Sequence, residues 1–272
     1  MDPCIRIGAV NYLNTKPLIY DLAELAPEAE LLLDVPSRLA DLLQQGRLDV
    51  ALIPAIEYFR GGSYSVVPDI AIAGNGPVLS VTLFSRVPWP AIRRVALDAG
   101  SRTSAALTQI LLRKKYGVTA EIQPLPLDKG AEDVDADAVL LIGDRAMRAC
   151  LPGFAHAFDL GQEWHDWVGL PFVYAVWAVR PGADLGGVAE ALHEAKRRGC
   201  RQIGTIAHRE APQLGLDAGF CRRYLQHIIR FDLGPREQAG LHHYYMLACE
   251  LGLARKGVSL DFYHPAHLVA GR

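Results

Sequence analysis

The chain has 272 residues, a formal net charge of −2 and a hydrophobic fraction of 50%. These values are typical of a soluble globular protein and exclude a disordered, collagen-like or low-complexity chain. The balance of 28 basic and 30 acidic residues gives no reason to expect nucleic acid or an anionic membrane as a partner.

Strand and helix signals alternate through the first third of the chain. Three short apolar runs predict strands at Ile5–Val10, Leu31–Val35 and Asp49–Ile53, the first of them buried. Between them, a helix is expected over Thr15–Leu25, and a second helix is expected from an N-cap at Ser37 to a stop at Gly46. Strands and helices joined in this order by short links predict a parallel sheet that is covered on both faces.

The same alternation returns in the middle of the chain and then stops. Further strands are expected at Val78–Phe84, Arg94–Leu97, Ala138–Ile142 and Phe172–Val179. A helix that ends at Gly117 follows the second of these strands, and after Arg180 the pattern indicates consecutive helices. Two strand–helix sets predict two lobes, with a small-molecule site between them at the carboxyl ends of strands.

The start of the chain and its cysteines indicate a compartment. No basic start is followed by an apolar stretch, and the longest apolar run is far shorter than the ~20 residues that span a bilayer. The five cysteines are widely spaced, which favours reduced thiols and a cytoplasmic protein. Zinc-binding, Walker and dinucleotide patterns do not appear in the sequence.

The segment from Asp98 to Ser104 is the best candidate for an anion site, because a strand turns into a helix there. Free N–H groups and the helix dipole favour a carboxylate or phosphate at such a turn by ~0.3–2 kcal/mol. The hydroxyls of Ser101, Thr103 and Ser104 add donors, and Arg102 offers a bidentate partner. The same spacing also suits a simple helix cap with Arg102 facing water.

Polar residues follow three other predicted strands. They are Asn11-Tyr12-Leu13-Asn14-Thr15 after the first strand, Glu57 shortly after Ile53-Pro54, and Gly143-Asp144 after Ile142. Each segment is also compatible with an ordinary turn or helix start. Among nine histidines, His165 stands between acidic residues, but adjacent residues on a helix do not face one another and form no triad.

Seven strings in order, covering about residues 5–180, carry a family resemblance. They are Val10–Leu18, Pro36–Ala40 with Gly46–Pro54 and Glu57-Tyr58, Gly76–Ser85, Ala96–Ser104, Leu140–Asp144, Asp159–Trp164 and Gly169–Val173. Together they resemble the chorismate dehydratases of the futalosine route to menaquinone. The helical tail adds agreement in length and little else.

The resemblance implies an α/β, two-lobed, periplasmic-binding-protein-like type II fold with a helical C-terminal segment. Lobe one would comprise residues 1–79 plus 177–272 and lobe two residues 80–176, with crossing strands near Val78–Ser85 and Phe172–Val179. The resemblance also implies a hydro-lyase whose substrate is chorismate and whose product is 3-[(1-carboxyvinyl)oxy]benzoate. It implies no cofactor or metal and leaves the oligomeric state open.

Asn14 occupies the position that the resemblance marks as catalytic. An amide is no base at neutral pH, so its expected role is to hold a substrate carboxylate or the departing hydroxyl by hydrogen bonds. The expected substrate contacts are Tyr12, Pro54, Glu57, Ser80, Ser101, Arg102, Thr103, Ser104, Gly143 and Asp144. We expect the enolpyruvyl carboxylate of the substrate to remove the ring proton, with Glu57 as the rival base.

Two other functions stay open. One is a non-catalytic cytoplasmic protein of the same fold that binds a small anion. The other is the later naphthoate-forming enzyme of the same pathway, for which a histidine base is expected. None of the matched cleft strings contains a histidine.

Overall fold

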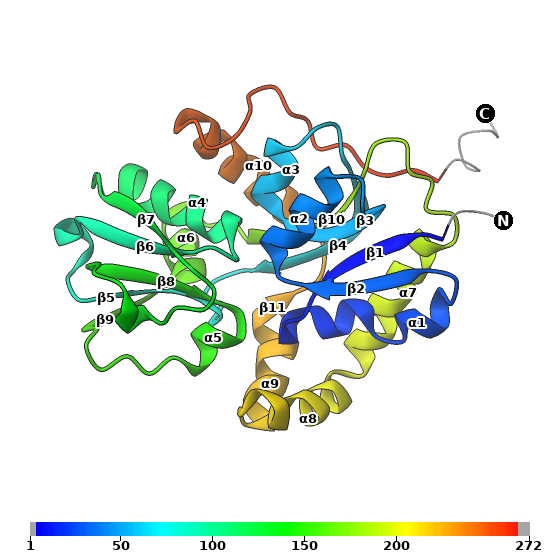
Figure 1. The fold of residues 1–272 in the computed structure, drawn as a ribbon, viewed down its shortest axis with the longest axis horizontal. Coiled ribbons are helices and arrows are strands. Elements are labelled where there is room, and N and C mark those ends of the chain that lie inside the picture. Colours follow the sequence, from blue (N-terminus) through cyan, green and yellow to red (C-terminus); the bar gives the residue numbers. More distant parts are fainter. Residues whose placement is uncertain (1–3, 266–272) are drawn as a thin grey trace.

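Two α/β lobes lie side by side in the computed structural model, which describes residues 4–265 (Figure 1). One sheet has six strands in the order β11-β4-β10-β3-β1-β2, and the other has five strands in the order β7-β6-β8-β5-β9. We name the lobe around the six-stranded sheet the large lobe and the lobe around the five-stranded sheet the small lobe. The residue boundaries given above for the two lobes stay a prediction.

The large sheet consists of β1 (Arg6–Val10), β2 (Glu30–Asp34), β3 (Val50–Pro54), β4 (Ser65–Gly74), β10 (Phe172–Val179) and β11 (Ile229–Arg230). The helices between its first strands are the 3-10 helix η1 (Leu13–Ile19), α1 (Leu22–Leu25), α2 (Pro36–Gln44) and α3 (Ala55–Arg60). The C-terminal tail adds α7 (Val188–Arg201), α8 (Ile203–Leu214), α9 (Ala218–Arg223), the π-helix η5 (Tyr224–Ile228) and α10 (Pro235–Glu250).

The small sheet consists of β5 (Val81–Ser85), β6 (Arg94–Asp98), β7 (Glu121–Leu125), β8 (Ala138–Ile142) and β9 (His156–Asp159). Its longer helices are α4 (Arg102–Ile110), which continues as the π-helix η3 (Leu111–Lys115), α5 (Gly143–Arg148) and α6 (Leu160–Val168). Two 3-10 turns, η2 (Trp89–Ala91) and η4 (Ala131–Asp133), complete the lobe.

The predicted strand–helix–strand core of the large lobe is confirmed. Strand β1 pairs in parallel with β2 and β3, and all five residues of β3 are buried. Each fully buried Val, Leu or Ile side chain there contributes roughly 1.5–3 kcal/mol to folding. Helix α2 begins one residue before the predicted cap, because Pro36 occupies its first position and the N-cap residue is Val35.

The single helix predicted over Thr15–Leu25 is wrong. The chain forms a 3-10 helix around Pro17, becomes extended at Tyr20 and left-handed at Asp21 (φ 55°), and only then starts the four-residue α1. Pro17 has no N–H to donate, and the left-handed backbone at Asp21 ends any helical repeat. The segment after β1 is therefore a compact turn that holds Asn14 close to the end of the strand.

Both sheets are mixed rather than parallel as predicted. Strand β10 runs antiparallel to β3 and β4, and β5 runs antiparallel to β8 and β9. Each of these two strands is the first strand after the chain crosses from the other lobe. It therefore enters its sheet from the side of the other lobe and runs antiparallel to its neighbours. Strand β5 begins at Val81, not at Val78, and the sequence patterns missed β4, β7, β9 and β11.

Two segments carry the chain between the sheets: residues 75–80, between β4 and β5, and residues 160–171, between β9 and β10. The Asp159 carboxylate joins them, because it accepts hydrogen bonds from four backbone N–H groups. Two donors, Val78 and Leu79, lie in the first segment, and the other two, Gly161 and Gln162, begin the second. Because Gly161 and Gln162 form the first turn of α6, this carboxylate caps that helix and holds the first crossing segment against it.

The predicted helical tail is confirmed from α7 to α10, apart from the two-residue strand β11, but residues 251–265 form no helix. Helix α7 packs against η1 so closely that a Cβ at Gly199 would lie 2.0 Å from the Pro17 carbonyl oxygen. Helix α10 reaches the small lobe, where the Tyr244 hydroxyl donates to the Thr103 carbonyl oxygen across 3.0 Å. The tail is thus packed on the turn that carries Asn14 and on the first turn of α4.

Candidate functional site

A cavity lies between the two sheets, where Val10 ends β1, Pro54 ends β3 and Ile142 ends β8. We call it the cleft cavity. Its walls are formed by Val10, Tyr12, Asn14, Pro36, Pro54, Ile72, Val78, Ser80, Val81, Ser101, Ser104, Ile142, Gly143, Tyr174, Ala175 and Ile229. Its volume of about 60 Å³ is far below the roughly 300–1,000 Å³ of occupied ligand pockets, so the lobes are closed on one another.

Seven of the predicted site residues meet on this cavity: Tyr12, Asn14, Pro54, Ser80, Ser101, Ser104 and Gly143. The other four do not line the cavity but lie beside it, where they form hydrogen bonds between the two lobes: Glu57, Arg102, Thr103 and Asp144. Whether any of the eleven contacts a substrate stays a prediction.

Tyr12 crosses from the large lobe to the small lobe. Gly143 has φ +57°, and a Cβ there would lie 3.1 Å from the Tyr12 ring, so the position requires glycine for both its backbone and its space. Burial raises the pKa of Tyr12, and the nearby charges of Asp98 and Asp144 raise it further. The Tyr12 hydroxyl is therefore a neutral donor at physiological pH.

Asp144 ties the same turn to the small lobe. Its carboxylate accepts a hydrogen bond from the Leu13 N–H across 3.3 Å, and burial raises its pKa. This bond joins the start of η1 to the start of α5, which makes Asp144 a contact between the lobes in this conformation.

The turn at the start of α4 is both a helix cap and part of the cavity wall. Ser101 Oγ accepts a hydrogen bond from the Ser104 N–H and donates to Ser104 Oγ across 2.8 Å. Thr103 Oγ1 turns toward the large lobe and accepts a hydrogen bond from the Ile56 N–H. Two of the three predicted hydroxyl donors are thus directed to the cavity, at the positive end of the α4 dipole.

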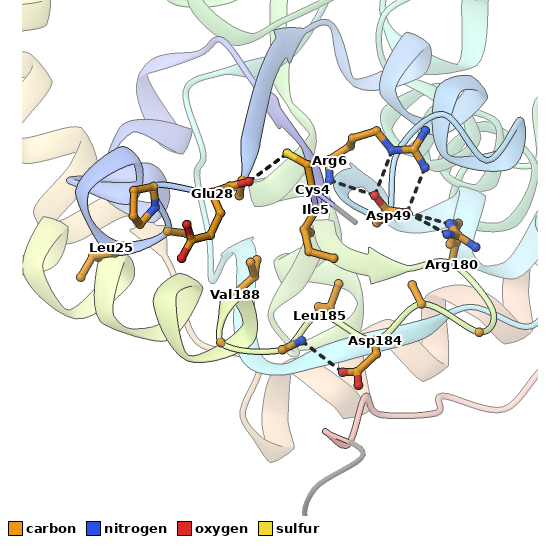
Figure 2. Close-up of a pocket in the computed structure, with 17 residues that line it drawn as sticks. Cys4, Ile5, Arg6, Leu25, Glu28, Asp49, Arg180, Asp184, Leu185 and Val188 are labelled. Atoms are coloured by element: carbon orange, nitrogen blue, oxygen red, sulfur yellow. Dashed lines mark hydrogen bonds and ion pairs between the residues drawn. The ribbon is translucent and has the colours of Figure 1, made fainter. Parts of the chain in front are cut away.

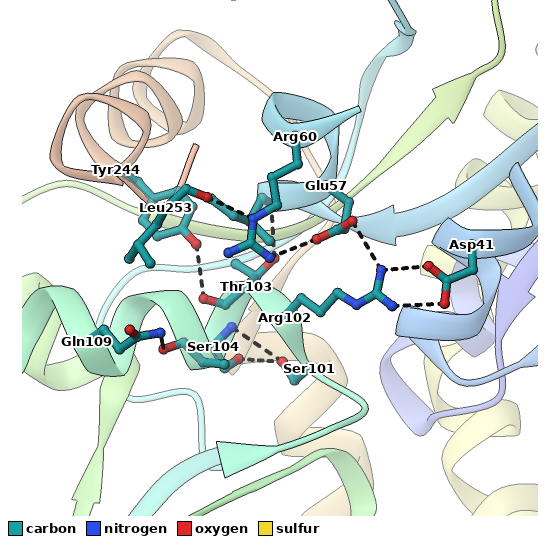
Figure 3. A network of polar contacts seen from close by, with 12 residues as sticks. Asp41, Glu57, Arg60, Ser101, Arg102, Thr103, Ser104, Gln109, Tyr244 and Leu253 are labelled. Atoms are coloured by element: carbon teal, nitrogen blue, oxygen red, sulfur yellow. Dashed lines mark hydrogen bonds and ion pairs between the residues drawn. The ribbon is translucent and has the colours of Figure 1, made fainter. Parts of the chain in front are cut away.

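Arg102 and Glu57 form a network beside the cavity (Figure 3). The Arg102 guanidinium makes two 2.8 Å hydrogen bonds to the Asp41 carboxylate and a third, of 3.1 Å, to Glu57. Arg60 holds the other Glu57 oxygen at 3.0 Å. The predicted anion-binding arginine therefore bridges α4 to α2 and α3, and the predicted rival base is held by two arginines.

Sequence reasoning missed two tyrosines at the site. Tyr174 of β10 lines the cavity, and its buried hydroxyl has no hydrogen-bond partner among residues 4–265. Tyr224 of η5 lies behind the wall and donates a 2.9 Å hydrogen bond to Ser80 Oγ. For Tyr174 the available signal was a tyrosine inside an otherwise apolar run, whereas Tyr224 stands among polar residues and had no such signal.

A larger cavity of about 730 Å³ lies at the amino ends of β1 and β3 (Figure 2). The guanidinium groups of Arg6 and Arg180 on its wall both bind Asp49, which stands between them. Burial alone raises the pKa of Asp49, but the hydrogen bonds from the two arginines outweigh this effect and lower the pKa to about 2. This cavity is not our candidate site, because both arginines are neutralised in part by one carboxylate and none of the predicted site residues lines it.

Residues 4–265 contain no group of three or more His, Cys, Asp or Glu side chains arranged to hold a metal ion. Within the same residues, no helix combines the length and the apolar character needed to span a bilayer.

The fold and the position of the cavity define the class of protein. The chain is similar to the alkanesulfonate-binding protein SsuA of Xanthomonas axonopodis, with a TM-score of 0.67, 16% identity and coverage of 96% of this chain and 97% of that one. A protein of Archaeoglobus fulgidus gives a TM-score of 0.75 at 20% identity, covering 92% and 98% of the two chains. The chain therefore has the type II periplasmic-binding-protein fold, as the resemblance predicted.

Sequence comparison gives the family. A family model described as menaquinone biosynthesis matches residues 5–250, and the chain belongs to that family. A chorismate dehydratase of Thermus thermophilus is 33% identical over 86% of this chain and 92% of its own length. A chorismate dehydratase of Campylobacter jejuni is 26% identical over 91% and 99% of the two chains.

Proposed function

We propose that the chain is a chorismate dehydratase, which removes water from chorismate to give 3-[(1-carboxyvinyl)oxy]benzoate in menaquinone biosynthesis. The observation that carries this proposal is the 33% identity to a chorismate dehydratase over most of both chains. The chemistry of the cleft cavity supports it independently.

The reaction needs positioning more than strong catalysis. Chorismate carries two carboxylates, a ring hydroxyl and an enolpyruvyl ether. Loss of the hydroxyl and of the proton on the ring carbon that bears the ether makes the ring aromatic, which supplies the driving force. The protein must hold the substrate in one orientation so that elimination occurs rather than rearrangement.

The cavity offers neutral hydrogen-bond donors to a doubly negative substrate. Ser80, Ser101 and Ser104 line it with hydroxyls, and Asn14 lines it with an amide. At the start of α4 the Ser104 N–H is taken by the Ser101 cap, and the N–H groups of Arg102 and Thr103 are proposed to add to these donors, because the start of a helix leaves them without intrahelical partners. Fixed dipoles of this kind stabilise charge that develops on the departing hydroxyl as the C–O bond breaks.

The base is proposed to be the substrate itself. None of the described residues that line the cavity is His, Lys, Cys, Asp or Glu. Glu57, the rival base, lies outside the wall and is held by Arg60 and Arg102. The enolpyruvyl carboxylate is therefore the basic group closest to the ring proton, and the proton it takes leaves with the hydroxyl as water.

Incubation of the purified protein with chorismate tests the proposal. We expect a product lighter by one water, with the chromatographic and mass signature of 3-[(1-carboxyvinyl)oxy]benzoate, at a rate that scales with protein concentration. Chorismate that binds but returns unchanged beyond the uncatalysed background would instead indicate a binding protein. Turnover of a later intermediate of the pathway, with chorismate untouched, would indicate the naphthoate-forming enzyme.

A further inference from the structure

Ser80, on the wall of the cleft cavity, is hydrogen-bonded to a residue of the C-terminal tail. The Tyr224 hydroxyl donates to Ser80 Oγ across 2.9 Å. Only 2% of Ser80 and 1% of Tyr224 is exposed, so water does not compete for this bond. Ser80 lines the cavity and Tyr224 does not, so we expect a bound substrate to meet Ser80 rather than Tyr224.

The direction of this hydrogen bond decides what Ser80 offers to the cleft. Burial raises the pKa of Tyr224 far above its usual range, so the phenol keeps its proton and acts as the donor. Because Ser80 Oγ accepts that proton, its own hydroxyl proton is free to point to a group in the cavity.

The backbone around Tyr224 is specialised. Tyr224 is the first residue of the π-helix η5, which follows α9 directly and leads into β11. π-helical turns are rare in proteins, and those that occur often lie at functional sites. Five residues further on, Ile229 of β11 lines the cavity itself, so this stretch of the tail contributes both to the wall and to the layer behind it.

We propose that Tyr224 is a positioning residue for the dehydration, which orients the Ser80 hydroxyl as a donor to the substrate oxygen that gains charge as water leaves. The inference rests on the proposed function. The phenol itself takes no part in bond breaking. Its contribution is to fix a neighbouring donor before the reaction begins.

The test is a double-mutant cycle with Tyr224→Phe, Ser80→Ala and the double variant, assayed for chorismate turnover. We expect each single variant to lose kcat by about 10- to 100-fold, while KM changes by less than about threefold. In the Ser80→Ala background, Tyr224→Phe is expected to lower kcat by no more than about threefold, because the positioned hydroxyl is already absent.

Tyr245→Phe is the matched control. Its hydroxyl is also largely buried, donates to the Arg255 carbonyl oxygen and accepts from the Val258 N–H, on a part of α10 outside the cavity wall. We expect this variant to keep kcat within about twofold of the wild type while it loses stability comparable to that lost by Tyr224→Phe.

Three outcomes overturn the proposal: Tyr224→Phe with wild-type kcat, equal losses from Tyr224→Phe with and without Ser80, or an equal kcat loss in Tyr245→Phe. If Tyr224→Phe alone fails to fold, the double variant, which removes both partners of the bond, is compared with Ser80→Ala, and a much lower kcat in the double variant overturns it. A wild-type protein that leaves chorismate unchanged refutes the proposed function instead.

Discussion

Substitution of Asp41 by alanine is expected to make the cleft open more often. The cleft cavity holds about 60 Å³, room for about two water molecules, so chorismate enters only after the lobes separate. Separation must break the contacts of Arg102 with Asp41 and Glu57 (Figure 3). Asp41→Ala removes the bidentate half of this network and leaves the Glu57 contact in place.

The size of the effect follows from exposure and geometry. The side chains of Arg102 and Asp41 are 31% and 45% exposed, so solvent screens the pair and its loss costs about 1 kcal/mol. At 25 °C this free energy raises the population of the open form about fivefold. Where opening limits binding, the association rate of chorismate rises by the same factor.

Stopped-flow tryptophan fluorescence on mixing with chorismate measures this rate. Asp135→Ala is the control, because Arg94 and Asp135 form a similar bidentate pair inside the small lobe. We also expect added salt to accelerate the wild type more than Asp41→Ala, since salt screens the intact pair. An association rate equal to that of the wild type, or an equal gain in Asp135→Ala, would refute the reasoning.

Three further results are expected. Asn14→Ala and Asn14→Asp should each lower kcat for chorismate by about 10²- to 10³-fold, and wild-type rates in both would contradict a catalytic role. Asp49, with its pKa lowered from 3.8 to about 2, should contribute roughly 2 kcal/mol of stability that is present above pH ~4 and lost as pH falls toward 2. Measurement of the free energy of unfolding at several pH values checks this. Asp49→Asn should be less stable than the wild type at pH 7 and should lose less stability between pH 4 and pH 2. Gly143→Ala should lose about 1–3 kcal/mol of stability through its positive φ and the Tyr12 ring, and an unchanged melting temperature would contradict that packing.

The parts of the fold that the sequence predicts are those with local signals. The buried runs at β1, β3 and β8 are continuous and apolar, so their periodicity and length suffice. Strand β4 was missed because Pro68 and a left-handed Asp69 (φ 58°) interrupt its apolar pattern, and the register against β10 shifts there. Tertiary pairing overrides these local breaks.

The candidate site divides in the same way. Asn14 and Ser101 follow predicted strands, so the rule that ligands meet at strand ends brings them to one cavity. The ion pairs of Arg102 and Glu57 could not be predicted from the sequence, because their partners lie up to 61 residues away along the chain. Tyr224 is 144 residues from Ser80, and no local pattern connects two positions so far apart.

The four N–H groups that converge on the Asp159 carboxylate have a mechanical consequence. Each of them stabilises a half-buried charge, so we expect this point to stay fixed while the far ends of the lobes move apart. The swing that admits a ligand is then a rotation about one pivot, with the largest displacement far from Asp159 and the smallest beside it. A shear motion of one sheet past the other is disfavoured, and we expect the lobes to open about a single hinge.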